Sequence, residues 1–323
     1  MAYNDPQLVH LDTMLTQISV GYENPAAYVA SMLFPSVRVA KQSDKYFVMT
    51  REVWGRETND IRAPGSEANE LPAMTLSRDT YFIEEHALEG VVADEELENA
   101  DSPLTPAQDT TEQVTNTILL NRELIQMRLA TTVANYSSGF SATLAGTAQW
   151  SDYTNSNPIT DVRTAMKKIH DTLFMDPNTV IMGYNVYWQL QEHPDLLARL
   201  TYQVPQIASD AQIASVLGIP NFVVAGGGSL TNVYGQAETF GYTWGRDVVF
   251  AWVPPNPGRK VPAFGYEFVL PYGGGNVQPV ERWREEKRKS DVVRVSRRYD
   301  TKLIAVDGSG DSVAGYLIKD AVA

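Results

Sequence analysis

The chain has 323 residues, 43% of them hydrophobic, and a formal net charge of -13. That apolar content is ample for a core, and the length suits one large domain or two of ordinary size. The acidic balance weighs against duplex DNA as a direct ligand, because such binding depends on lysine and arginine side chains. The chain contains no cysteine, which excludes disulfides, thiolate nucleophiles and cysteine-bound zinc and suits a reducing compartment.

The N-terminal residues, MAYNDPQLVH, lack the basic and then apolar regions of a secretory signal. No part of the chain approaches the ~18 uninterrupted apolar residues that span a bilayer. We therefore expect neither a leader nor a membrane segment.

Two strand-forming runs, SVRVAKQSDKYFVM and SRDTYFIEEHALEG, flank a charged loop punctuated by proline and glycine within residues 36–90. Such an arm has too little apolar surface to pack on itself, so it must lie on another surface, which we interpret as another copy of the chain. Four of its residues are of the types that carry interface energy. They are Arg51, Trp54, Arg56 and Arg62.

An acidic segment follows the arm, and its run from Asp94 to Glu98 includes Glu95 and Glu96. Five consecutive positions cannot all face one ion, so an acidic helix start that favours the helix dipole is simpler than a metal cluster. Between residues 66 and 101 the only base is Arg78, whereas residues 282–302 are rich in arginine and lysine. Segregated charge of this kind can set the register between subunits, although a solvated surface explains any one residue equally well.

A long helix is predicted over about residues 106–135. Thr105 is the expected N-cap, with Gln108 three residues on and Pro106 at the first helical position. Its expected apolar face comprises Val114, Ile118, Ile125, Leu129 and Val133. Such a helix is about 45 Å long, which suits the backbone of a flat subunit, although an ordinary core helix fits the pattern too.

Residues 137–158 are small and polar and predict a turn or a short exposed hairpin. Asn157 and Pro158 then open a second amphipathic helix, after which strand–helix units occupy residues 178–191 and 209–225, with Gly218 and Pro220 as a stop signal. Strands separated by glycine and proline turns fill residues 247–322. These elements predict an α+β fold.

No motif for catalysis or for cofactor or metal binding is evident. The four histidines, His10, His86, His170 and His193, are far apart and lack metal-site spacing. The glycine triplets at 226–228 and 273–275 lack the pattern of a dinucleotide loop and are expected to be mobile loops. The run 307–311 has the alternating oxygen side chains of a calcium loop but no bidentate glutamate, so a hairpin turn explains it better.

The order of these elements resembles the major capsid proteins of tailed bacteriophages, with the Hong Kong ninety-seven-like fold. The resemblance covers nearly the whole chain and depends on order and spacing more than on any single motif. The residues that carry it are Phe34-Pro35, Lys45-Tyr46, 62–65, 94–100, Asn121-Arg122-Glu123, 177–179, 193–197 and 314–318.

This resemblance implies a division of the chain into five parts. They are an N-terminal arm (1–35), an extended loop (36–80), a peripheral domain with a spine helix (81–175), an axial domain (176–262) and return strands, mainly peripheral (263–323). In an axial domain, the glycine-rich loops would crowd a symmetry axis. The short arm implies a separate scaffolding protein, and the absence of lysine from Trp54 to Ala73 argues against covalent crosslinking through the loop.

The function that the resemblance implies is that of a structural subunit, not an enzyme, with no cofactor. Copies would self-assemble in the host cytoplasm into pentamers and hexamers of an icosahedral virion shell with a portal, and a decoration protein is a further candidate partner. The shell would enclose double-stranded DNA without sequence-specific binding, which an acidic container permits. The alternative is a soluble α/β enzyme without a recognisable motif, for which the carboxylates Glu84, Glu85 and Asp94 are the candidate catalytic groups.

Overall fold

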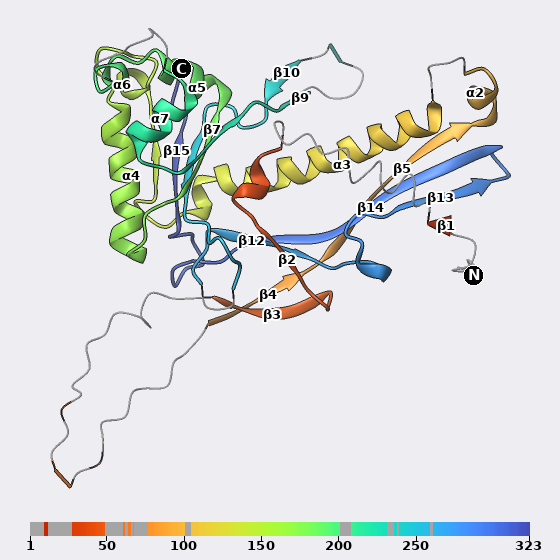
Figure 1. The fold of residues 1–323 in the computed structure, drawn as a ribbon, viewed down its shortest axis with the longest axis horizontal. Coiled ribbons are helices and arrows are strands. Elements are labelled where there is room, and N and C mark those ends of the chain that lie inside the picture. The colour runs from red at the N-terminus through yellow and green to blue at the C-terminus, as the bar shows by residue number, and fades with distance from the viewer. Residues whose placement is uncertain are drawn as a thin grey trace.

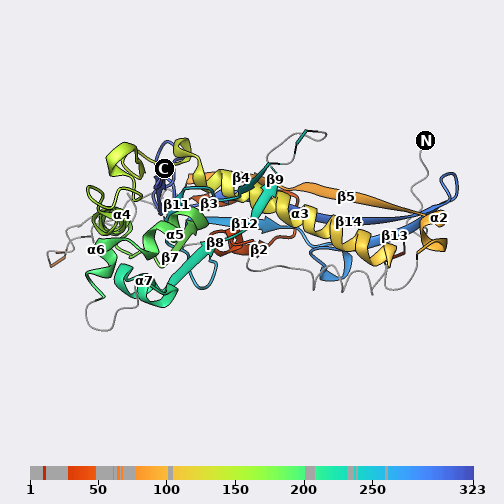
Figure 2. The ribbon, with the colours of Figure 1, turned by 90° about the horizontal axis from the view of Figure 1, so that it is seen from above.

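The computed structural model describes residues 10–11, 28–48, 61, 64–65, 67, 77–100, 105–200, 208–230, 236–237, 239–258 and 261–323. The molecule is elongated, with a helix-covered sheet at one end and long strands beneath one long helix at the other (Figures 1 and 2). None of the described helices is both long and apolar enough to cross a membrane.

A six-stranded sheet forms the extended end. Its strands are β1 (His10–Leu11), β2 (Ser36–Arg38), β5 (Glu84–Ala93), β12 (Gly265–Val269), β13 (Val280–Glu285) and β14 (Ser290–Leu303). The long strand β14 organises this sheet, because it pairs with β5 along one edge and with β12 and β13 along the other. Beside it, β3 (Ser43–Val48) and β4 (Ser77–Phe82) pair as the antiparallel base of the predicted extended loop.

The long helix is α3 (Pro106–Thr131), which lies across β5 and β14 (Figure 1). Val114 and Ile118 pack against valines of β13 and β14 beneath the helix. Pro106 occupies the first turn as predicted, but the Thr105 side chain makes no capping bond; the Thr105 amide instead donates to the Asp109 carboxylate at 3.3 Å. Thr105 is therefore the N-cap residue, as predicted, but its side chain does not cap the helix.

The predicted apolar face of α3 is only partly correct. Ile125 and Val133 are exposed, and the buried side continues instead through Arg122, Glu123 and Gln126. The α-helix also ends at Thr131, before the predicted end at residue 135, and a 3-10 turn, η3 (Val133–Asn135), follows. The helix thus buries polar side chains in its second half, which a search for apolar periodicity cannot detect.

A five-stranded sheet in the order β6-β15-β11-β7-β8 forms the other end. Its strands are β6 (Ser141–Thr143), β7 (Thr179–Gly183), β8 (Asn221–Ala225), β11 (Val248–Ala251) and β15 (Gly315–Lys319). The helices of this region are α4 (Pro158–Leu173), α5 (Tyr184–Gln191), α6 (Pro194–Leu197) and α7 (Asp210–Leu217). The main hydrophobic cluster lies among these elements.

Several predictions for this region are confirmed at the level of single residues. Asn157 caps α4, its side chain accepting from the Thr160 amide at 3.0 Å, with Pro158 in the first turn. Gly218 ends α7 in the left-handed conformation, at φ 72°. The strand–helix pairs β7–α5 and α7–β8 lie where the sequence predicts them.

The prediction of an exposed turn or hairpin over residues 137–158 is wrong. Within this segment, β6 pairs in parallel with β15 and so extends the five-stranded sheet. Trp150 is fully buried and donates from Nε1 to Asp161 at 2.9 Å. One tryptophan among small polar residues therefore anchors the segment to α4.

Sheet membership differs from the sequence-based grouping. β6 and β15 belong to the five-stranded sheet and α4 packs on β15, although the sequence grouped them with the spine helix or the return strands. β2 belongs to the six-stranded sheet, so the paired base of the extended loop begins at β3. The remaining elements are η1 (Ala30–Met32), α2 (Asp94–Glu98), η4 (Gly146–Ala148), β9 (Gly228–Leu230), β10 (Phe240–Tyr242) and η5 (Gly273–Gly275).

Candidate functional site

Two consecutive buried side chains on α3 join separate parts of the molecule. Arg122 makes two charge-assisted hydrogen bonds to Glu267 of β12, from Nε at 2.6 Å and from Nη2 at 3.0 Å. Arg297 of β14 and Ser36 of β2 also donate to this carboxylate, at 3.2 Å and 2.5 Å. Burial alone would raise the pKa of Glu267, but the two arginines and these hydrogen bonds lower it overall.

Glu123, the next residue, faces a different set of partners. Its carboxylate accepts from the amides of Val29 and Ala30, at 3.0–3.2 Å, and from Nε1 of Trp244 at 2.7 Å. Burial raises the pKa of Glu123, and the hydrogen bond from Trp244 and those from the two amides offset only part of that effect. One turn of α3 therefore holds β12, the segment before β2 and the turn before β11 together.

The histidines have separate environments. The buried ring of His193 accepts from the Asp195 amide at the start of α6 and lies 3.1 Å from Ser156 Oγ. His86 stacks on Tyr299, and burial lowers its pKa. His170 pairs with Asp176 at 2.9 Å, and the side chain of His10 is outside the described part.

Metal ligands do not gather in the part of the chain that the structure describes, where no three His, Asp or Glu side chains form a possible ion site. The run 307–311 forms the predicted hairpin turn, in which Asp307 Oδ1 accepts from the amides of Ser309 and Asp311 at 2.8 and 3.1 Å. A hydrogen bond from Ser137, followed by these amides, lowers the pKa of Asp307.

Among the described residues, three carboxylates of the acidic segment pair with the basic stretch within the chain. Because β5 lies antiparallel to β14, Arg298 meets Glu85 at 3.2 Å, and Arg294 lies 3.8 Å from Glu89. Arg284 of β13 forms an ion pair with Asp94. These three carboxylates therefore have partners within the chain, and a role of the segregated charge between subunits stays a prediction. It also follows that Glu85 and Asp94, offered as enzyme carboxylates, lie near opposite ends of β5 and do not form one site.

Of the six predicted contact residues, the structure places only two. Glu95 and Glu96 are exposed on α2, where the part of the chain described here offers them no ion-pair partner. The other four lie outside the described residues: Arg51, Trp54, Arg56 and Arg62.

An aromatic patch, which the sequence did not reveal, lies on the five-stranded sheet's side of the molecule. We define it as Tyr184, Trp188, Leu230, Phe240 and Tyr242. Phe240 and Leu230 are opposite each other in the β9–β10 pair, and Tyr242, two residues on, shares their face. Tyr242 stacks on Tyr184 at 5.2 Å, and Tyr184 lies 6.4 Å from Trp188. Phe240 is 73% exposed and Trp188 55%, which marks a surface for a partner.

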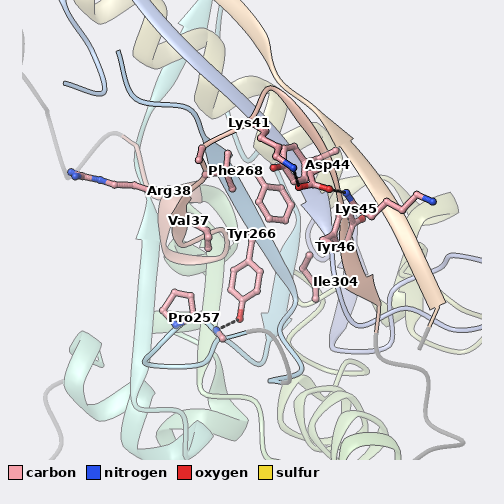
Figure 3. A pocket seen from close by; sticks show the side chains of 14 residues that line it. Val37, Arg38, Lys41, Asp44, Lys45, Tyr46, Pro257, Tyr266, Phe268 and Ile304 are labelled. Atoms are coloured by element: carbon pink, nitrogen blue, oxygen red, sulfur yellow. Dashed lines mark hydrogen bonds and ion pairs between the residues drawn. The ribbon is translucent and has the colours of Figure 1, made fainter. Parts of the chain in front are cut away.

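A cavity of about 610 Å³ opens at the base of the β3–β4 pair (Figure 3). Tyr81, Tyr266 and Phe268 contribute an aromatic floor. Charged side chains surround it, with Arg38 and Lys45 extending in opposite directions from its two sides. We call it the hairpin-base cavity. It combines an apolar interior with a mainly cationic rim.

Comparison with known proteins adds independent information. No family model matches the chain. The chain is 26% identical over 314 residues to the major capsid protein of Burkholderia phage BcepMu, covering 95% of each. It is 31% identical over 187 residues to the major capsid protein of Pseudomonas phage JBD67, covering 58% of each.

Solved structures agree. A phage-related protein from Bordetella bronchiseptica RB50 superposes with a TM-score of 0.75 at 25% identity, covering 97% of this chain and 98% of that one. The mature capsid of bacteriophage PhiM1 gives a TM-score of 0.54 at 11% identity, covering 90% and 86%. The chain has the phage major capsid fold. The predicted resemblance to the Hong Kong ninety-seven-like capsid proteins is confirmed.

In terms of this capsid fold, α3 is the spine helix, and Arg122 and Glu123 connect it to β12 and to the turn before β11. The resemblance had singled out Asn121-Arg122-Glu123, but nothing in the sequence revealed that Arg122 and Glu123 are buried. The aromatic patch and the hairpin-base cavity are then surfaces that neighbouring subunits can cover.

Proposed function

We propose that the chain is the shell subunit of a phage capsid. The observation that carries this proposal is the similarity to the major capsid protein of phage BcepMu over 95% of both chains. The shape supports it, because an elongated subunit with exposed apolar surfaces at separate places suits repeated contacts with several neighbours. Its task is then to form interfaces rather than to catalyse a reaction.

The finer form of the proposal concerns the assembly and its contents. Pentamers and hexamers build an icosahedral shell around double-stranded DNA, without a membrane. The net charge of -13 supports containment without tight binding. A separate scaffolding protein and a portal complete the particle, which assembles in the host cytoplasm, and a decoration protein is a further candidate partner.

The proposed division of labour follows the two sheets. The six-stranded sheet with α3 forms the peripheral domain, and the five-stranded sheet with its helices forms the axial domain, where the aromatic patch faces neighbours within one capsomer. The extended loop supplies Arg51, Trp54, Arg56 and Arg62 to an adjacent subunit, and α2 supplies Glu95 and Glu96.

Sedimentation and electron microscopy of the purified full-length protein test the function. We expect capsomers and closed particles of megadalton size. A small closed oligomer under every solution condition, including with a scaffolding protein supplied, would contradict the proposal.

A deletion variant tests whether the extended loop takes part in the contact between subunits. Deletion of residues 55–69 should leave a folded chain that no longer closes shells, because the loop contributes burial between subunits rather than core burial. Circular dichroism and unfolding curves control for folding. Normal particles from the deletion would remove the loop from the assembly interface.

A further inference from the structure

The hairpin-base cavity has the chemistry of a docking site. Its floor belongs to a cluster of buried apolar side chains in which Tyr81 stacks on Phe268 at 4.7 Å and Tyr46 contacts the same ring at 5.2 Å. The hydroxyl of Tyr46 donates to Asp79 at 2.9 Å. These three floor rings are themselves buried and close the bottom of the cavity, and the half-buried side chains of Val37, Val39 and Tyr46 add apolar surface around them for an apolar side chain of suitable size.

The rim of this cavity has an excess of positive charge. Three basic residues, Arg38, Lys41 and Lys45, and one acidic residue, Asp44, contribute to it. Lys41 is paired with Asp44 at 3.3 Å. Arg38 and Lys45 are exposed and form no ion pair with the residues that the structure describes. An occupant with an apolar side chain flanked by carboxylates would match this surface.

The short helix α2 has that composition. Its sequence is Asp-Glu-Glu-Leu-Glu, and Leu97 is 37% exposed in the midst of the acidic side chains. Because successive residues of an α-helix are separated by ~100°, Glu96 and Glu98 flank Leu97, whereas Glu95 points to nearly the opposite side. Asp94 is already paired with Arg284, whereas Glu96 and Glu98 have no ion-pair partner among the residues that the structure describes, so these two can meet a cationic rim.

The two surfaces cannot meet within one molecule. α2 lies at the far end of the β5–β14 pair, whereas the cavity lies beside β2 and β3 near the middle of the molecule, and both views agree (Figures 1 and 2). A contact between them must therefore join two copies. Two different patches make a heterologous contact, which forms rings or extended lattices rather than isolated pairs.

We propose that α2 of one subunit docks in the hairpin-base cavity of a neighbouring copy, with Leu97 against the aromatic floor and with Glu96 and Glu98 facing Arg38 and Lys45. This inference rests on the proposed shell function. In this contact the partner of α2 is the hairpin-base cavity of a neighbouring copy, rather than the arginines of that copy's extended loop. Leu97 supplies the anchor, and the charges set the register.

Site-specific crosslinking tests this contact directly, because the chain has no native cysteine. Leu97→Cys is combined with Ala40→Cys, at an exposed position lining the cavity. Particles assembled under reducing conditions and then mildly oxidised should give covalent multimers on non-reducing gels. The matched pair Glu95→Cys with Ala40→Cys should give at least tenfold less crosslink, because Glu95 faces away.

Reversing the charges on the two surfaces is a second test of the contact. Glu96→Lys with Glu98→Lys should raise the subunit concentration needed for particles about tenfold, the lower end of the coupling of close charge pairs, whereas the neutral pair Glu96→Gln with Glu98→Gln should raise it less. Adding Arg38→Glu and Lys45→Glu should restore assembly. Unfolding curves of the unassembled subunits should coincide, since all these side chains are exposed.

Three outcomes distinguish a failure of this docking inference from a failure of the proposed shell function. Wild-type particles that form without a Leu97–Ala40 crosslink would overturn this inference and leave the shell function intact. Rescue of the Glu96/Glu98 variant by Arg56→Glu with Arg62→Glu, but not by the cavity variants, would likewise overturn it, in favour of the extended loop. Failure of the wild-type chain to assemble at all would instead count against the proposed function.

Discussion

Arg122 and Glu267 are 145 residues apart in the chain, yet they form a two-point ion pair that fixes the spine helix to β12. Glu267 is fully buried and Arg122 nearly so. Glu123, the next residue of α3, accepts hydrogen bonds from the segment before β2 and from Trp244. The position of α3 therefore depends on both Arg122 and Glu123.

The first prediction concerns the cost of breaking this pair. Arg122→Ala leaves Glu267 with only Arg297 and Ser36, and removing one partner of a buried ion pair costs ~3–5 kcal/mol. Urea unfolding of the unassembled subunit measures the change. Arg122→Met combined with Glu267→Gln should cost less than the sum of the single changes, because the interaction between these two residues is then lost only once, although Arg297 is left facing a neutral amide. Additive costs would contradict the coupling.

The second prediction is that Glu267 and Glu123 give pH dependences of opposite sign. The pKa of Glu267 is lowered from 4.5, so its stabilisation is present above that pH and is lost as the pH falls through the lowered value. The pKa of Glu123 is raised, so the unfolded chain releases this proton first and stability falls as the pH rises from 4.5 through the raised value.

Denaturant unfolding between about pH 3 and pH 7 separates the two. Glu267→Gln should remove part of the loss of stability in acid, and Glu123→Gln should remove a loss that appears on the alkaline side of 4.5. Parallel curves for wild type and Glu123→Gln would show that the burial of Glu123 does not affect its ionisation.

Structural features that depend on short stretches of the chain were predictable from the sequence. The Asn157 cap, the Gly218 stop and the apolar period of α4 each depend on a few neighbouring residues. The burial of Arg122 and Glu123 was not predictable, because their partners Glu267 and Ala30 lie 145 and 93 residues away. Composition likewise showed the segregated charge but not that β14 lies beside β5 and places Arg294 near Glu89 and Arg298 near Glu85.

The third prediction tests the close approach of α3 to β5. A Cβ at Gly90 would lie 2.2 Å from Cγ2 of Thr110 and 3.0 Å from Cγ2 of Val114. Gly90→Ala should therefore lower the free energy of unfolding by ~1–3 kcal/mol, as overpacking does. Thr110→Ala removes the nearest atom and should restore most of this loss in the double variant. If the double variant does not recover stability, the cost of Gly90→Ala arises within β5 itself rather than from the contact with Thr110.

The fourth prediction concerns the aromatic patch. Phe240→Glu with Trp188→Glu should leave monomer stability within about 0.5 kcal/mol, because both side chains are largely exposed. Capsomers should fail to form, since two buried carboxylates would lack partners in the interface. Phe240→Leu with Trp188→Leu keeps the surface apolar and is the matched control. Normal capsomers from the glutamate variant would show that this patch faces solvent in the particle.

The fifth prediction concerns Phe174, which ends α4 in a left-handed conformation at φ 56° although its side chain is 75% exposed. Glycine adopts this conformation without a steric cost, and little burial is lost with the ring. Phe174→Gly should therefore keep the unfolding free energy within about 1 kcal/mol of wild type or raise it.

Phe174 has a backbone conformation that favours glycine, which indicates that its ring has a role outside the folded monomer. Phe174→Gly should then raise the subunit concentration needed for particles, and Phe174→Tyr, which retains an aromatic ring, should not. Light scattering over a concentration series measures both. Identical assembly of the two variants would mean that the exposed ring has no neighbour in the shell, and the strain at residue 174 would have no functional explanation.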